Sequence, residues 1–132
     1  QSQSTSGACS ISQAAATAAL DGPQDCVAKM RLEYKRRYEY LLHALNGIDG
    51  IQCEESDGAF YAFPSFKDAI ERMPDIRDDV ELAGWMLEHA GVAVVPGATF
   101  GAPGHLRLSY ATSMENLQAC VRRIGDALRK TI

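Results

Sequence analysis

The sequence lacks an apolar run of about 18 residues, so it predicts no membrane-spanning helix. Its first residues, QSQSTSGACSISQ, have neither a basic segment nor an apolar core and therefore predict no signal peptide. They also lack an initiator methionine, which we interpret as the sign of a mature or cut product. The chain also has no excess of basic residues, because it contains 13 Lys and Arg and 17 Asp and Glu, which gives a net charge of −4. We expect no nucleic-acid or membrane partner, since either would need a basic face on the protein. We also expect a cytoplasmic protein.

Metal-binding cysteine patterns are absent as well. None of the four cysteines lies at CxxC spacing or near a histidine at metal-ligand spacing. They are Cys9, Cys26, Cys53 and Cys120. We expect no metal site and free thiols in a reducing compartment, with a disulfide as the alternative.

The residues that are present predict one domain with a real core, because 46% of the 132 residues are hydrophobic. A capping pattern at Ser10 and Gln13 precedes an alanine-rich helix that should end at residues 21–23, Asp-Gly-Pro. This tripeptide is also the one candidate for a domain boundary. A long helix should then run to about residue 46, with one apolar stripe: Val27, Met30, Tyr34, Tyr38, Leu41, Leu42 and Leu45.

The second half of the chain predicts short strands that alternate with helices. The expected elements are strands at 51–53, 59–63, 92–95 and 106–110, and helices at 66–73, at 80–90 and from residue 112 onward, where Thr112 and Glu115 should form the cap. The segment at 92–95 is fully apolar and should be buried on both faces. This order indicates an α+β fold, with helices on one side of a small sheet.

Arg107 is the sharpest candidate for a functional residue. With a period of two, His105, Arg107 and Ser109 share one face of the last strand. An arginine is costly to bury unless an anion meets it, and its planar guanidinium suits a carboxylate. The residues alone leave two alternatives: a structural salt bridge with one of the 17 acidic residues, or an anionic ligand.

Other patterns are weaker. The glycine-bearing loop at 95–101 follows an apolar strand but matches no phosphate-binding motif. The aromatic run at 58–63 favours core packing over base stacking, because the chain is acidic. The histidines at 43, 89 and 105 lie far apart and form no triad pattern.

Four segments, taken together, resemble one family. They are residues 1–13 (QSQSTSGACSISQ), 57–63 (DGAFYAF), 91–100 (GVAVVPGATF) and 105–113 (HLRLSYATS). In order and spacing they resemble the C-terminal part of bacterial aspartate aminotransferases, which belong to the fold-type I pyridoxal-phosphate enzymes. The resemblance covers the whole chain. It implies that residues 1–22 end a large cofactor-binding domain and that residues 23–132 form the small domain, with a mostly antiparallel sheet covered by helices and preceded by a long helix.

The resemblance also implies roles for particular residues. Arg107 matches the family arginine that binds the α-carboxylate of the substrate. The reaction would move an amino group from aspartate, or a similar amino acid, to a 2-oxo acid such as 2-oxoglutarate, with pyridoxal 5'-phosphate as electron sink. The complete enzyme would be a homodimer, in which Ser4, Thr5 and Ser6 approach the neighbouring subunit's site. The segment Ser6-Gly7-Ala8 stands where members commonly have Ser-Asn-Pro or a similar tripeptide, so Gly7 offers no side chain for such a contact.

The catalytic lysine of the family has no match in this chain. That lysine lies in a Ser-Lys motif followed by a Gly-x-Arg segment, and neither occurs here. We therefore expect a fragment that holds no catalytic residue, does not bind the cofactor itself and does not transaminate alone. The alternative is a free-standing α+β module that binds an amino acid or oxo acid through Arg107.

Overall fold

The computed structural model describes residues 7–131 and divides the chain into two units, Gln1–Glu33 and Tyr34–Ile132. The elements, in chain order, are α1 (Ser10–Asp21), α2 (Asp25–Asn46), β1 (Tyr61–Ala62), α3 (Lys67–Arg72), α4 (Asp79–Trp85), the π-helix η1 (Met86–Ala90), β2 (Val95–Pro96), the 3-10 helix η2 (Gly97–Phe100), β3 (Leu106–Ser109) and α5 (Met114–Arg129). The predicted division after residue 22 concerns a longer enzyme and stays a prediction.

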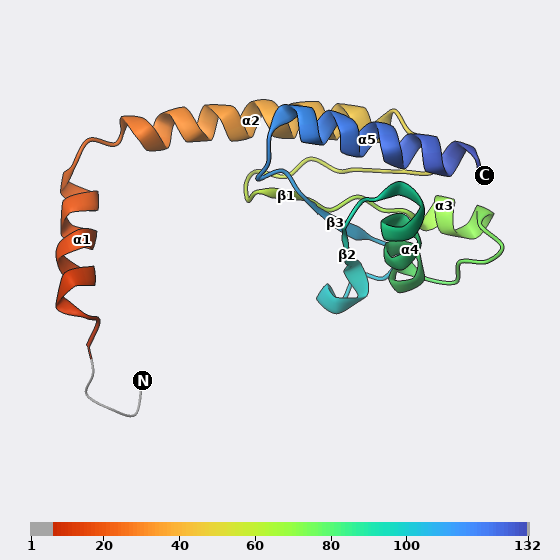
Figure 1. Cartoon of the computed structure of the whole chain (residues 1–132), viewed down its shortest axis with the longest axis horizontal. Helices are drawn as coiled ribbons and strands as arrows, with labels where there is room; N and C mark the ends of the chain where they lie inside the picture. The colour runs from red at the N-terminus through yellow and green to blue at the C-terminus, as the bar shows by residue number, and fades with distance from the viewer. Residues whose placement is uncertain (1–6, 132) are drawn as a thin grey trace. The chain divides into compact units, whose positions relative to one another are not determined.

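The first unit contains α1 and the start of α2 (Figure 1). The predicted alanine-rich helix is confirmed and ends at Asp21, as the Asp-Gly-Pro sequence indicated. Its predicted cap is displaced, because Ser10 is the first helical residue and Cys9 occupies the N-cap without a side-chain hydrogen bond. The Gln13 side chain instead donates to the backbone oxygen of Ala8 at 2.7 Å. No residue of α1 is buried.

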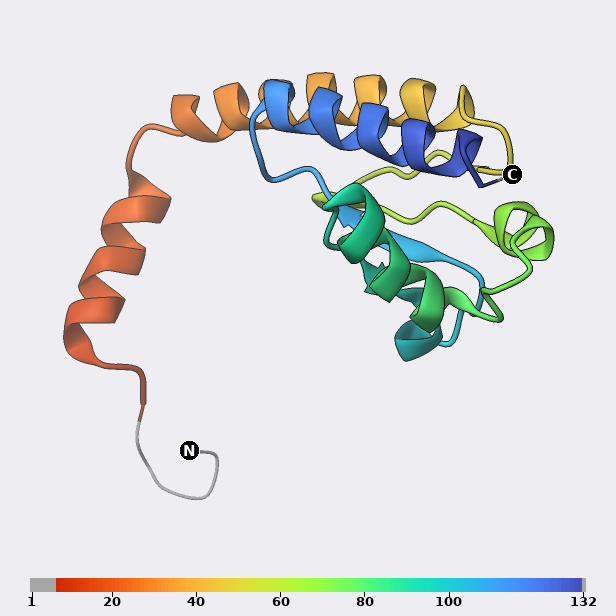
Figure 2. The ribbon, with the colours of Figure 1, turned by 45° about the vertical axis from the view of Figure 1, so that its right-hand side comes forward.

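The long helix α2 is confirmed, and its stripe is buried only towards the C-terminal end. Leu41 and Leu45 are fully buried, whereas Val27 and Met30 remain half-exposed. Asn46, the last residue of the helix, hydrogen-bonds with both backbone groups of Cys53. Residues 34–46 of α2 lie side by side with α5, and the strands run beneath them (Figures 1 and 2).

The sheet has three short antiparallel strands in the order β1-β3-β2. With its surrounding helices it confirms the predicted α+β fold and the small antiparallel sheet. The strand expected at 51–53 is reduced to a bridge between Gln52 and Ser65. A side-chain contact accounts for this, because Asn46 already occupies the hydrogen-bonding groups of Cys53.

The prediction of a strand buried on both faces at 92–95 is wrong. Only Val95 and Pro96 pair, at the edge of the sheet, and Ala93 is exposed. The preceding helix widens into η1, and the N–H of Val92 donates back to Met86 at 3.1 Å. The backbone at residue 92 is therefore still part of the helix end.

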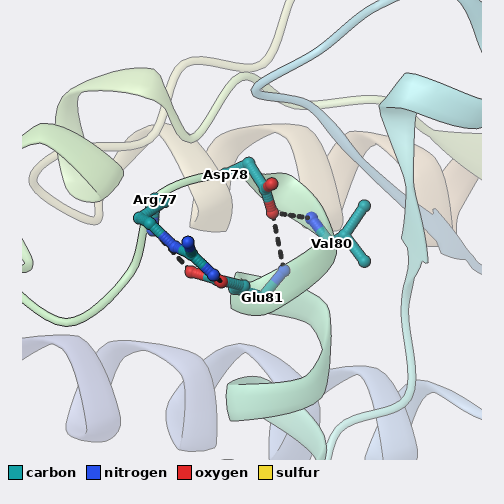
Figure 3. A network of polar contacts seen from close by, with 4 residues as sticks. All are labelled: Arg77, Asp78, Val80 and Glu81. Carbon is teal, nitrogen blue, oxygen red and sulfur yellow. Dashed lines mark hydrogen bonds and ion pairs between the residues drawn. The ribbon is translucent and has the colours of Figure 1, made fainter.

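Two helices cover the remaining core and begin at well-defined caps. Figure 3 shows the start of α4, where the Asp78 carboxylate accepts hydrogen bonds from the N–H groups of Val80 and Glu81. The N-cap of α5 is Ser113, one residue after the predicted Thr112, and its hydroxyl accepts a hydrogen bond from the N–H of Asn116 at 3.2 Å. The buried core comprises, among others, Leu41, Leu45, Phe66, Leu82, Met86, Leu106, Ile124 and Leu128.

Candidate functional site

Arg107 lies in the middle of β3, the central strand of the sheet. Its neighbours Leu106 and Leu108 point into the core and are buried, whereas Arg107 is half-buried and Ser109 is exposed. The predicted alternation of faces is therefore confirmed. Because β3 pairs on both sides, the backbone that carries Arg107 is held by two neighbouring strands.

The Arg107 guanidinium lies over two aromatic rings. Its central carbon is 4.8 Å from the ring centre of Phe100 and 5.3 Å from that of Tyr61. Both rings are partly open to solvent, with exposed fractions of 51% and 37%. Arg107, Phe100 and Tyr61 are called the Arg107 site below.

The structural salt bridge that the residues alone left open is not present among residues 7–131. Within this range Arg107 makes no ion pair and no hydrogen bond, whereas Arg72, Arg77 and Arg129 each pair with a carboxylate. A guanidinium whose faces meet aromatic rings keeps the N–H donors along its edge available. That edge matches the two oxygens of a carboxylate.

Phe100 is carried by a short loop, residues 97–104, which folds back on itself. The N–H of Gly97 donates to the carbonyl oxygen of His105 at 2.7 Å, and the N–H of Ala102 donates to Gly97 at 3.0 Å. Gly101 and Gly104 have left-handed backbone angles, with φ of 74° and 79°, which favour glycine. The predicted glycine-bearing loop therefore borders the Arg107 site.

A buried carboxylate anchors this loop. Asp79, in the first turn of α4, is 1% exposed and accepts hydrogen bonds from Ala98 N–H at 2.8 Å and Gly104 N–H at 3.0 Å. Burial alone would raise the pKa of the Asp79 carboxyl, but the N–H groups of Gly104 and Ala98 outweigh it and hold the pKa below its ordinary value. Asp79 is thus a fixed negative charge beneath the loop.

Sequence patterns did not indicate three of these residues. The aromatic pattern at 58–63 predicts core packing, but in β1 only Ala62 is buried, and Tyr61 lies against Arg107. Phe100 and Asp79 carry no motif of their own.

The remaining predicted residues lie elsewhere. Ser4, Thr5 and Ser6 fall outside the described residues, and their role stays a prediction. His105 stacks on Phe63 with ring centres 5.3 Å apart. All four cysteines are free thiols. Within residues 7–131 no group of three His, Cys, Asp or Glu side chains is placed to hold a metal ion, and no helix there has the length and apolarity to cross a membrane.

A family model for class I and II aminotransferases matches residues 1–124. The chain belongs to this family. Aspartate/prephenate aminotransferase of Nitrosomonas europaea is 47% identical over 97% of this chain and 34% of its own length. Aspartate aminotransferase of Rhizobium meliloti strain 1021 is 41% identical over 96% of this chain and 32% of its own length. The chain thus spans about a third of these relatives.

Solved structures of aminotransferases share the fold. A crystal structure of aspartate aminotransferase from Rhizobium meliloti superposes on 99% of this chain and 34% of its own with a TM-score of 0.91 at 39% identity. Alanine aminotransferase from Pyrococcus furiosus superposes on 86% of this chain and 28% of its own with a TM-score of 0.78 at 30% identity. The fold-type I architecture that the resemblance implied is therefore confirmed.

The family uses pyridoxal phosphate, and the expectation that this chain does not bind the cofactor itself stays a prediction. The four lysines, Lys29, Lys35, Lys67 and Lys130, are all exposed. The edge of the Arg107 guanidinium carries N–H donors in a geometry that suits a carboxylate.

Proposed function

We propose that this chain is the C-terminal part of a homodimeric, cytoplasmic aspartate-type aminotransferase. Residues 1–22 end the large cofactor-binding domain, and residues 23–132 form the small domain. The preferred donor is aspartate and the acceptor a 2-oxo acid such as 2-oxoglutarate. The names of the relatives support aspartate. The four free thiols support a reducing compartment.

The observation that carries the proposal is the unpaired edge of the Arg107 guanidinium. An amino acid and a 2-oxo acid share one group, the carboxylate next to the reacting carbon. One arginine can therefore bind the substrate of each half-reaction and hold its reacting carbon in the same place. Pyridoxal phosphate, when bound by the rest of the enzyme, supplies the electron sink.

Exposed apolar residues of the first unit support the view that the chain is part of a larger domain. Ile11 and Leu20 of α1 are each 79% exposed. In the proposed enzyme these side chains pack against the rest of the large domain. A free-standing module that binds an amino acid or oxo acid through Arg107, the alternative, has no use for such a helix. The chain alone should not transaminate, because it has no match to the Ser-Lys and Gly-x-Arg segments of the family.

The test replaces Arg107 with glutamine and with lysine in the full-length enzyme. A charged, largely desolvated carboxylate contact contributes about 2–4 kcal/mol, so Arg107→Gln should lower kcat/KM about 30- to 900-fold. The loss should be similar for the amino acid and for the 2-oxo acid, because both present the same carboxylate. Arg107→Lys should retain part of the activity, since it keeps the charge but not the two-pronged geometry.

Arg129→Gln is the matched control. It removes the same charge from the surface pair with Asp126, which contributes little to stability and lies on α5. We expect its kinetics to equal those of the unmodified enzyme. Unchanged kcat/KM in Arg107→Gln would refute the proposed role of Arg107.

A further inference from the structure

The two adjacent aspartates at the start of α4 serve different partners. Asp78 accepts from the N–H groups of Val80 and Glu81, both within its own helix (Figure 3). Asp79 accepts from Ala98 and Gly104, which lie 19 and 25 residues further along the chain. Asp78 therefore caps the helix, and Asp79 fastens the loop 97–104 at both ends.

The position of this loop decides where Phe100 lies. Phe100 stands between the two residues that Asp79 holds, and its ring covers one face of the Arg107 guanidinium at 4.8 Å. The same ring meets Phe63 edge-on, with ring centres 6.0 Å apart. A shift of the loop would move the Phe100 ring away from the arginine while leaving β3, which carries Arg107, paired on both sides.

We propose that Asp79 is a positioning residue for substrate binding: through the loop 97–104 it holds Phe100 against Arg107, so that the edge of the guanidinium stays turned towards the substrate carboxylate. This inference rests on the proposed role of Arg107. Asp79 is almost completely buried, so we expect it to contact neither the substrate nor the reacting atoms. Both of its carboxylate oxygens accept hydrogen bonds, from the N–H groups of Ala98 and Gly104. An asparagine side chain would place its own NH2 group against one of these donors and lose that hydrogen bond.

The experiment measures steady-state kinetics of Asp79→Asn, Phe100→Leu, the double variant and Arg107→Gln in the full-length enzyme. The carboxylate is bound equally in the ground state and in the transition state, so weaker holding of Arg107 should raise KM and leave kcat nearly unchanged. From the strength of a cation–π contact we expect KM to rise about 2- to 30-fold in Asp79→Asn and in Phe100→Leu. The double variant should be little worse than either single variant, because both changes act through the same contact.

Asp78→Ala is the matched control. It removes the neighbouring carboxylate and the N-cap of α4, and so lowers the melting temperature without touching the loop. Its KM should equal that of the unmodified enzyme. An Asp79→Asn enzyme with a lower melting temperature but an unchanged KM would show a structural role only and overturn the inference. A double variant whose KM rises by the product of the two single-variant increases would overturn it as well.

The outcomes separate this inference from the proposed function. Normal kinetics in Arg107→Gln would overturn the proposed function itself. A raised KM in Arg107→Gln with a normal KM in Asp79→Asn would overturn only the positioning role. If Asp79→Asn fails to fold, Phe100→Leu still decides, because an unchanged KM in that variant removes the contact through which Asp79 is inferred to act.

Discussion

Replacing Gly97 with alanine should destabilise the chain strongly, although both residues are small. Gly97 is buried, and a Cβ built on it would lie 2.7 Å from the carbonyl oxygen of His105 and closer still to that of Ala102. Both contacts are with backbone, so no side chain can move aside. The same stretch of backbone carries the hydrogen bonds from Gly97 N–H to His105 and from Ala102 N–H to Gly97.

The magnitude follows from these contacts. Overpacking costs about 1–3 kcal/mol, and each weakened hydrogen bond costs about 1 kcal/mol. We expect Gly97→Ala to lower the free energy of unfolding by about 2–4 kcal/mol, measured by urea unfolding of the 132-residue chain.

Gly84→Ala is the matched control with the opposite sign. Gly84 lies inside α4, and a Cβ there would meet nothing within 4 Å. Alanine is the better helix former by about 1 kcal/mol, so this variant should be slightly more stable. A Gly97→Ala chain as stable as the unmodified one would refute the close packing assigned to the loop 97–104.

Two further predictions concern Tyr110, which follows β3, and Ala59, which precedes β1 and accepts a hydrogen bond from the Tyr110 hydroxyl. Burial, and then the neighbouring Tyr38 and Tyr34, raise the pKa of Tyr110, whose hydroxyl donates to Ala59 at 2.8 Å. The neutral phenol therefore stabilises the fold below its ordinary pKa of about 10, and this contribution is lost as the pH rises through the raised value. Tyr110→Phe should lower the free energy of unfolding by about 1 kcal/mol near neutral pH and reduce the loss of stability at alkaline pH. A loss of stability at alkaline pH that is the same with and without Tyr110 would contradict this. Ala59 has a φ of 73°, so Ala59→Gly should raise the urea midpoint by relieving strain worth about 1 kcal/mol, and a lower midpoint would count against that conformation.

The parts of the fold that depend on neighbouring residues were predictable from the sequence. The alternation at 106–110 predicted which side chains of β3 are buried, because the period of a strand is local. The helix α2 followed from its apolar stripe, and the start of α5 was predicted to within one residue from its polar cap.

The parts that depend on distant contacts were not predictable. Nothing in the sequence near residues 51–53 indicates that Asn46 occupies the backbone of Cys53 and so prevents a strand. Asp78 and Asp79 are chemically identical neighbours, and only the fold turns one towards its own helix and the other towards the loop 97–104. Arg107 was found because a charge in an apolar strand is unusual, whereas an aromatic residue such as Phe100 is common in a core and gave no such signal.

The most direct test of the central claim is a crystal structure of the full-length enzyme with a bound small dicarboxylate such as succinate. Two carboxylate oxygens should lie about 2.7–2.9 Å from two nitrogens of Arg107, with the guanidinium still against the rings of Phe100 and Tyr61. A dicarboxylate bound in the active site without contact to Arg107 would refute the role proposed for this arginine.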